Sequence, residues 1–216
     1  MCIRDRYTAY TPYQAEVAQG RLEALLNYQT VICDLTGMEL SNASLLDEGT
    51  SAAEAMTMLF SNRDREKVNN NCNKFFVADD VFDQTLDVLM TRAEPLGIEI
   101  VKNSIDKINV DKSFFGIYVQ YTGKNGQIND LKSISKAISN FDIKLVVAAD
   151  LLSLTTLEKP SLFNCDVVVG TSQRFGIPLG YGGPHAGYFA TKKQYKRSIP
   201  GRIIGVSKDT DGNRAL

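Results

Sequence analysis

A cluster of hydrogen-bonding side chains follows a short apolar segment in the last third of the chain. The apolar residues 167–169 (VVV) are followed, after Gly170, by the polar residues 171–174 (TSQR). A glycine-rich loop, residues 180–185 (GYGGPH), comes next and ends in His185, the single histidine of the chain. Ligands of α/β proteins bind beyond the carboxyl ends of parallel strands. The pattern therefore predicts a ligand site, and a tight hairpin without a ligand explains the same spacing equally well.

A helix start that could bind an anion is predicted at Ser51. Ser51 and Glu54 have the spacing of a capping box, which opens a helix to about residue 60. Free N–H groups and the helix dipole attract phosphate to such an N-terminus. Asp47 and Glu48 come just before it, and their carboxylates would repel a dianionic phosphate. We therefore favour an ordinary capped helix whose acidic residues complement its own dipole.

Alternating helices and strands must position these residues. Short apolar segments predict strands at residues 75–78, 98–102, 114–121, 144–149, 167–169 and 187–190. The spacing of apolar residues predicts helices at residues 12–36, 51–60, 83–96 and 131–141, and residues 62–74 are expected to form a polar surface loop. This alternation is typical of an α/β fold with a mostly parallel sheet flanked by helices.

The first of these helices has a clear start and end. Thr11 can cap it, Pro12 suits the first helical position, and Gly37 ends it. Its apolar stripe is explained by packing against a core. Tyr10 and Tyr13, at its start, are not explained by packing alone.

Composition excludes several classes of function. The 216 residues are 44% hydrophobic and 23% charged, as in ordinary globular proteins, and the net charge is −1. That charge argues against binding to nucleic acid or to anionic membranes. No apolar run approaches the roughly 20 residues that span a bilayer. The four cysteines are scattered, which argues against a zinc site and a disulfide framework and fits a reducing compartment.

Four segments resemble the N-terminal half of the glycine cleavage system P-proteins, the pyridoxal-phosphate-dependent glycine dehydrogenases (decarboxylating). They are residues 7–35, 42–58, 166–190 and 200–216. The resemblance implies the large domain of the fold-type-I pyridoxal-phosphate-dependent transferases, the aspartate aminotransferase-like fold. It also implies that the whole protein decarboxylates glycine and passes the aminomethyl group to the lipoyl arm of the carrier H-protein. The catalytic C-terminal half, or a separate catalytic subunit, is then the expected partner.

The resemblance also implies roles for individual residues. Gln173 stands where the catalytic half carries its Schiff-base lysine, and an amide cannot form an imine. No catalytic residue is therefore expected in this half, and pyridoxal phosphate is expected in the other half. Asp150 follows the strand at residues 144–149 and resembles the aspartate that pairs with the cofactor ring nitrogen. A turn or capping aspartate is an equally good interpretation of Asp150.

The remaining expectations concern the cleft, the chain ends and the rival functions. Tyr10, Tyr13, Ser51, Asp150, Gln173 and His185 are candidates for the cleft or for the interface with the catalytic half. Residues 1–6 do not continue the family pattern and are expected to be a non-native leader, with residues 7–216 a large domain that is incomplete at both ends. A cytoplasmic protein is expected in a bacterium, which we favour, and a mitochondrial matrix protein in a eukaryote. The rivals are a scaffold without catalytic residues and another enzyme of this fold, such as an aminotransferase.

Overall fold

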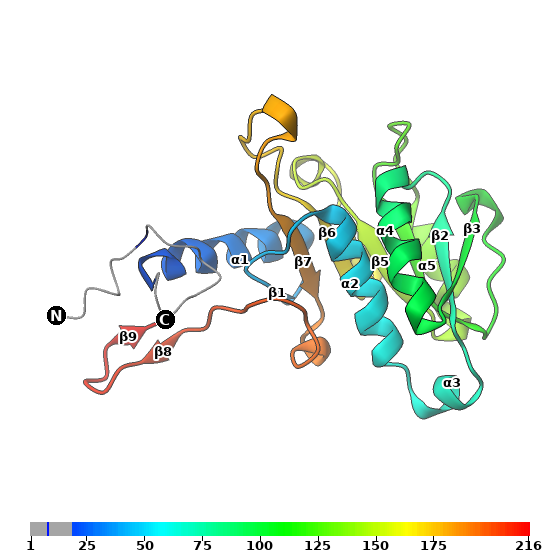
Figure 1. Ribbon diagram of the computed structural model, residues 1–216, viewed down its shortest axis with the longest axis horizontal. Coiled ribbons are helices and arrows are strands. Elements are labelled where there is room, and N and C mark those ends of the chain that lie inside the picture. The colour runs from blue at the N-terminus through cyan, green and yellow to red at the C-terminus, as the bar shows by residue number, and fades with distance from the viewer. Residues whose placement is uncertain (1–7, 9–18) are drawn as a thin grey trace.

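A seven-stranded sheet organises the protein (Figure 1). The computed structural model describes Thr8 and residues 19–216. The strands are β1 (Leu40–Ser41), β2 (Lys74–Ala78), β3 (Glu99–Asn103), β4 (Phe114–Gln120), β5 (Lys144–Ala148), β6 (Val167–Thr171) and β7 (Gly187–Thr191), in the order β1-β7-β6-β5-β4-β2-β3. Strands β2 to β6 are parallel, and β7 is antiparallel to both β6 and β1. The expected mostly parallel α/β fold is confirmed.

Helices cover both faces of this sheet. They are α1 (Leu22–Thr36), α2 (Glu48–Ser61), α3 (Arg65–Asn69), α4 (Asp83–Ala93) and α5 (Leu131–Ile138). In Figure 1, α2 and α4 lie in front of the sheet and α5 lies behind it. Apolar runs on the central strands fill the space between these layers, and every residue of β4 is buried. No described helix has the length and apolar character that crossing a membrane requires.

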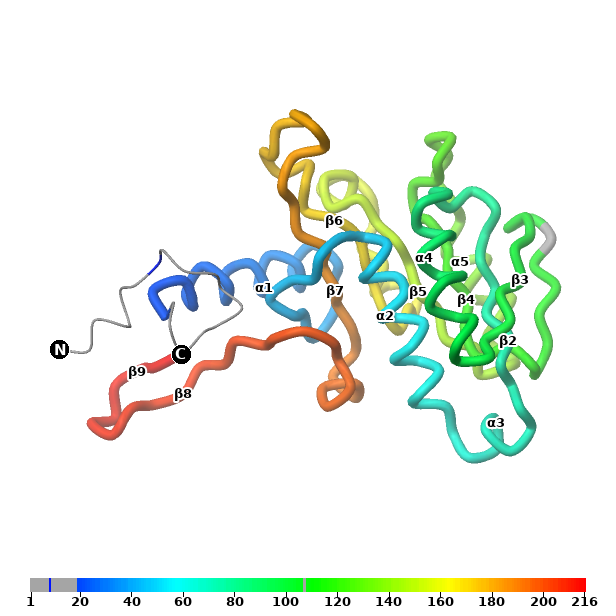
Figure 2. Tube along the Cα trace, in the orientation of Figure 1, coloured from blue at the N-terminus to red at the C-terminus, as the bar shows by residue number. Residues whose placement is uncertain are grey.

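An arm formed by α1 and the C-terminal segment extends away from the sheet (Figure 2). The two parts of the arm are joined through the side chain of Gln29. Its amide nitrogen donates to the carbonyl of Ile204 at 3.1 Å, and its amide oxygen accepts from the Ile204 N–H at 2.7 Å. A small hairpin, β8 (Ser207–Lys208) with β9 (Arg214–Ala215), ends the chain.

Most predicted elements are confirmed, because their start and stop signals are local. The predicted helix at residues 83–96 is α4 continued by a 3-10 turn, Glu94–Leu96, and it ends at Gly97 with a left-handed φ of 66°. The helix predicted at residues 131–141 is α5 followed by the 3-10 turn Ser139–Phe141. The six predicted strands correspond to β2 through β7.

One predicted helix start was wrong. Helix α2 starts at Glu48 rather than at Ser51, with the carboxylate of Asp47 accepting from the Thr50 N–H at 2.7 Å. Backbone pairing of Leu45 with Gly187 holds the chain extended up to this point, so the helix begins immediately afterwards. Ser51 instead lies in the first turn, buried, and donates to the carbonyl of Asp47 at 2.8 Å.

The predicted polar loop at residues 62–74 also contains a helix. Asp64 accepts from the Lys67 N–H at 2.7 Å and thereby caps α3. The asparagine-rich composition of residues 62–74 had predicted a loop because it gives no helical pattern of apolar residues. Within the described part of the first predicted helix, a 3-10 turn, Gln19–Arg21, precedes α1, which ends at Gly37 as expected. The predicted start at Pro12, and the candidates Tyr10 and Tyr13, lie outside the described residues.

Candidate functional site

The carboxyl ends of β4, β5 and β6 meet the N-terminus of α2. Gln120 is the last residue of β4, and its side-chain amide nitrogen donates to Glu48 Oε1 at 3.2 Å. Asp150 follows β5 by two residues, and Thr171 ends β6. The sheet thus gathers the predicted polar residues at the edge where ligands of α/β proteins bind.

Glu48 carries an unfavourable charge at this edge. Burial raises the pKa of its carboxyl group above the ordinary value, and the negative charges of Asp150 and Asp47 raise it further. The hydrogen bond from Gln120 lowers that pKa and offsets only part of the effect. Ionised Glu48 is therefore a costly group that a neighbouring positive charge would stabilise.

The N-terminus of α2 does not suit a phosphate. The carboxylate of Asp47 already accepts the hydrogen bond of the Thr50 N–H, and Glu48 adds a second carboxylate at the N-terminus of the helix. Both groups would repel an anion that otherwise favours a helix N-terminus. The residues of this chain therefore do not fit the phosphate of pyridoxal phosphate at this place.

Gln173 joins the turn after β6 to the glycine-rich loop. Its backbone N–H donates to Thr171 Oγ1 at 3.2 Å, and its side-chain amide donates to the carbonyl of Gly182. Lys192, which follows β7, lies at the opposite end of the sheet, where its Nζ is 2.8 Å from Asp166 Oδ1. A lysine at that end cannot reach the turn that contains Gln173.

Asp150 makes the contacts of a turn residue and also an ion pair. Its Oδ1 accepts from the Leu152 N–H at 3.2 Å, and its Oδ2 lies 3.1 Å from Nη1 of the mostly exposed Arg174. The structure therefore explains Asp150 through local contacts. Its proposed likeness to a cofactor-binding aspartate stays a prediction.

His185 lies between two cavities. One, of about 480 Å³, is shared with Asp47, Glu48 and Thr171, and the other, of about 860 Å³, with Ser172 and residues of α1. Among the residues described, no lysine lines either cavity. The Nδ1 atom of His185 is 3.0 Å from the carbonyl of Gly183, so Nδ1 carries the proton in this contact.

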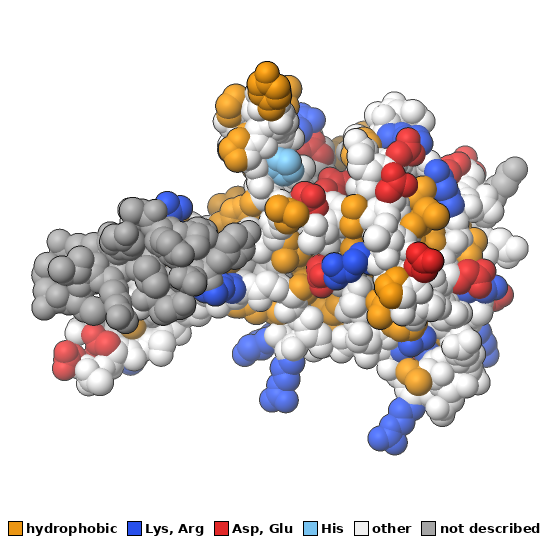
Figure 3. Space-filling view, in the orientation of Figure 1, with side chains coloured by type: hydrophobic (Ala, Val, Ile, Leu, Met, Phe, Trp, Pro, Cys, Tyr) orange, Lys and Arg blue, Asp and Glu red, His pale blue; other side chains and the backbone are white. Residues whose placement is uncertain are grey.

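The glycine-rich loop projects from the sheet and ends in hydrophobic side chains (Figure 3). Leu179 is 80% exposed, Tyr181 is fully exposed, and Phe175 near the base is also exposed. Tyr181 has a positive φ of 51°, which is uncommon for a residue other than glycine. Exposed apolar groups at a loop tip are typical of a surface that contacts another protein.

Gly187 brings the end of this loop against α2. A Cβ atom at this position would overlap the carbonyl oxygen of Asp47 and lie 2.7 Å from the hydroxyl of Ser51. Glycine is therefore required by the close approach of two backbones. Through this contact the structure brings Ser51 and the base of the loop together, and Gln173 and His185 lie at the same edge.

Two residues of the site were missed by the sequence analysis. Gln120 was treated only as part of an apolar strand, and Glu48 only as a group that would repel phosphate. A signal for Gln120 existed, since an amide side chain stands near the end of the otherwise apolar strand predicted at residues 114–121. Its pairing with Glu48, 72 residues away in the sequence, had no local signal.

Comparisons with known proteins agree with this architecture. The family model described as "Glycine cleavage system P-protein" matches residues 3–216. Glycine dehydrogenase (decarboxylating) from Flavobacterium johnsoniae is 60% identical over 211 residues, which are 97% of this chain and 22% of that protein. The corresponding protein from Christiangramia forsetii is 58% identical, with the same two shares. The chain thus spans about a fifth of the length of these relatives.

Solved structures extend the comparison to the fold. A crystal structure of glycine decarboxylase (P-protein) of the glycine cleavage system, in inhibitor-bound form, matches with a TM-score of 0.85 and 34% identity, covering 96% of this chain and 47% of that one. A putative O-acetylhomoserine (thiol)-lyase from Campylobacter jejuni, holding a pyridoxyl-lysine monophosphate, matches with a TM-score of 0.65 and 13% identity, covering 90% and 49%. The second match shows only that the fold is that of the fold-type-I pyridoxal-phosphate enzymes. The sequence model, the close relatives and the first structure agree over nearly all of the chain, which therefore belongs to the glycine cleavage system P-protein family.

Proposed function

We propose that this chain is part of a glycine dehydrogenase (decarboxylating). The whole enzyme would release CO₂ from glycine and pass the aminomethyl group to the lipoyl arm of the H-protein. The support is the 60% identity to a relative of that name over 97% of the chain. Because the chain spans only about a fifth of that relative, the activity belongs to the whole protein.

Within that enzyme, this region would hold no covalently bound cofactor. The observation that carries this proposal is Gln173, whose amide is engaged by the Gly182 carbonyl in the turn where the resemblance places a lysine. The acidic N-terminus of α2 supports it, because Asp47 and Glu48 disfavour a phosphate there. Pyridoxal phosphate would then be bound by the other half of the protein.

The glycine-rich loop would contribute to the interface with that other half. Its apolar tip, with Leu179 and Tyr181, is exposed in this chain and would be buried by a partner. His185 lines both cavities at the base of the loop and would form part of the cleft wall. The same surface is the expected position of the catalytic half.

Borohydride reduction of the full-length enzyme tests where the cofactor is bound. The enzyme is loaded with pyridoxal phosphate, reduced, digested and analysed by mass spectrometry. We expect one labelled lysine, outside the region matched by residues 7–216. A stoichiometric label on a lysine of this region, such as Lys192 or Lys193, would contradict the proposal and favour another enzyme of this fold, such as an aminotransferase.

A separate comparison distinguishes a cleft role from pure scaffolding. The catalytic half is assayed for glycine decarboxylation alone and together with the region described here. Activity that depends on this region supports the proposed role. Activity unchanged by its addition would favour a scaffold that only stabilises its partner.

A further inference from the structure

The larger of the two cavities beside His185, of about 860 Å³, is a groove with two walls. One wall is the face of α1 that carries Ala24, Tyr28 and Val31. These residues follow one another at intervals of four and three positions, so they lie on one side of the helix. Phe175, in the segment after β6, belongs to the other wall. The groove therefore exists only because folding brings two distant segments together.

The walls of this groove are apolar and reach solvent. Val31 is 49% exposed and Phe175 is 47% exposed. Leu179 and Tyr181 continue the apolar surface along the same loop, outside the groove (Figure 3). A small ligand is largely enclosed by its pocket, whereas this apolar surface extends past the cavity. The surface therefore suits a segment of protein chain better than a small molecule.

Charge distinguishes the groove from the smaller cavity on the other side of His185. Among the described residues that line the groove there is no aspartate or glutamate, whereas Asp47 and Glu48 line the smaller cavity. Arg21 lines the groove, and its recorded hydrogen bond goes to a neutral group, the carbonyl of Thr8. Within the described part of the chain, Arg21 forms no ion pair. The groove therefore favours an occupant that places a carboxylate near Arg21.

Proteins of this family contain much more chain than the part described here. The chain spans 22% of the relative from Flavobacterium johnsoniae and 47% of the chain in the solved P-protein structure. In a protein of that length, a segment of the same chain can cover the groove. Its effective concentration would exceed that of a second copy in solution, because it is covalently linked. A segment from the rest of the protein is therefore the favoured occupant.

We propose that the groove between α1 and the glycine-rich loop is a docking site for an apolar segment of the catalytic half, which places a carboxylate against Arg21. This inference rests on the proposed function, because that function supplies the other half as the partner. It adds α1 and the groove to an interface that otherwise involves only the loop. Burial of Val31 and Phe175 by this segment would stabilise the contact between the two halves.

A photoreactive amino acid at position 31 tests what covers the groove. Full-length enzyme with p-benzoylphenylalanine in place of Val31 is irradiated, digested and analysed by mass spectrometry. The excited ketone inserts into a nearby C–H bond, so only groups in contact are joined. The matched control carries the same amino acid in place of Thr30, which is exposed on α1 and does not line the groove.

We expect position 31 to be joined to a peptide of the catalytic half, outside the region matched by residues 7–216. Position 30 should give much less of that product. A cross-link from position 31 to this region of a second copy would overturn the proposal, and so would the absence of any cross-link.

A second measurement tests the carboxylate and avoids the bulky photoreactive group. Arg21→Glu should lower the Tm of the full-length enzyme by at least about 2 °C, because two negative charges would then face each other in the groove. Arg65→Glu is the matched control, since Arg65 is also exposed at the start of a helix but does not line the groove. A glutamate has the same favourable interaction with the helix dipole at both positions. Equal Tm values of the two variants would overturn the proposed carboxylate contact.

Rescue identifies the partner of Arg21. Changing the carboxylate nearest to the cross-linked position into lysine should restore the Tm of Arg21→Glu. Neither measurement uses the cofactor, so a failure of this proposal leaves the borohydride result unaffected. A labelled lysine within residues 7–216 would likewise leave the cross-link unaffected, so failures of the two proposals are distinguishable.

Discussion

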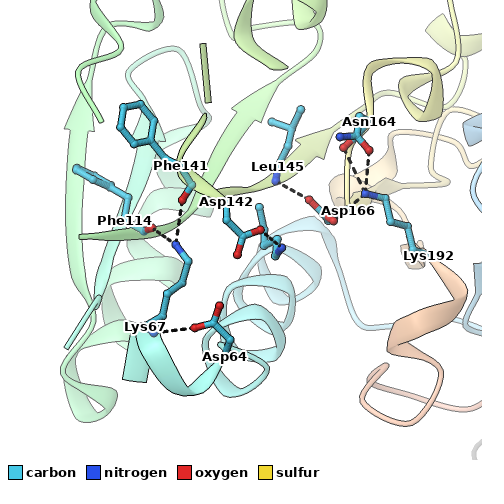
Figure 4. A network of polar contacts seen from close by, with 10 residues as sticks. Asp64, Lys67, Phe114, Phe141, Asp142, Leu145, Asn164, Asp166 and Lys192 are labelled. Carbon is cyan, nitrogen blue, oxygen red and sulfur yellow. Dashed lines mark hydrogen bonds and ion pairs between the residues drawn. The ribbon is translucent and has the colours of Figure 1, made fainter. Parts of the chain in front are cut away.

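At the amino ends of the parallel strands, Lys192 Nζ lies 2.8 Å from Asp166 Oδ1 and also donates to Asn164 (Figure 4). At the carboxyl ends, by contrast, Glu48 forms no ion pair within residues 19–216, and its hydrogen bond there comes from the neutral amide of Gln120. Both carboxylate oxygens of Asp166 have a partner, because its Oδ2 accepts from the Leu145 N–H at 3.0 Å while its Oδ1 faces Lys192. Lys67 likewise donates to two backbone carbonyls at the amino edge.

The difference indicates that the two edges have different tasks. Paired charges and satisfied carbonyls at the amino edge hold strands together. Within the described residues, an acceptor without a donor and a carboxylate without an ion pair at the carboxyl edge reduce stability, and such features are common at sites of binding or catalysis. Loss of a buried polar partner at the amino edge should therefore mainly change stability, whereas loss of a polar side chain that lines the cavities at the carboxyl edge should mainly change activity.

The largest effect on stability is expected from Asp166→Ala. The change leaves Lys192 without its carboxylate and the buried Leu145 N–H without an acceptor. We expect a loss of about 2–3 kcal/mol, below the range for a fully buried pair because Lys192 reaches solvent. Thermal unfolding and hydrogen exchange of β5 would measure it.

Asp142→Asn is the matched control for that variant. Asp142 pairs with Lys144 at 2.6 Å at the same edge, but both side chains are substantially exposed. Its left-handed φ of 50° also suits asparagine. We expect the free energy of unfolding to change by less than about 0.5 kcal/mol. Equal losses in the two variants would show that the buried contacts of Asp166 stabilise the protein no more than an exposed ion pair does.

A smaller loss, of about 2 kcal/mol, is expected from Gly187→Ala. The added Cβ would overlap the carbonyl of Asp47 and separate β7 from the start of α2. Gly180→Ala is the control, since a Cβ there meets nothing within 4 Å. A melting temperature of Gly187→Ala equal to that of Gly180→Ala would mean that the two backbones do not approach so closely.

For His185→Ala in the full enzyme, we expect a functional effect with almost no structural one. Truncating an exposed loop residue should change stability by less than about 0.5 kcal/mol. Glycine decarboxylation should fall at least about tenfold, equivalent to about 1.4 kcal/mol of transition-state stabilisation. Unchanged activity would remove the cleft role and leave the hairpin interpretation of the loop.

The smallest signal is expected from alkylation of Cys165, next to Asp166 at the amino edge. Burial raises the pKa of this thiol to about 12, with a smaller contribution from the charge of Asp166. Only about one thiol in 10,000 is then ionised at pH 8, so iodoacetamide should label it at least about 100-fold more slowly than free cysteine. The rate should increase with pH and become normal in denaturant, and rapid labelling of the native protein would show that this edge opens.

Much of the fold could be predicted from the sequence because its signals are local. Gly37 and Gly97 both end helices in the left-handed conformation, as glycine at a helix end predicts. The sequence also predicted the position of part of the candidate site, since it placed Asp150 and the turn at residues 171–174 at the carboxyl ends of strands. The helix start at Ser51 failed because Asp47 is an equally good cap by chemistry alone.

The sequence by itself determined the alternation of helices and strands and the family, and it carried the prediction that Gln173 stands in place of a lysine. Only the tertiary structure decided which polar groups meet. Glu48 and Gln120 are 72 residues apart, and their contact depends on the order of the strands and the placement of α2 across them. The raised pKa of Glu48 is likewise a property of this arrangement, because burial and neighbouring charges arise only when distant segments pack together.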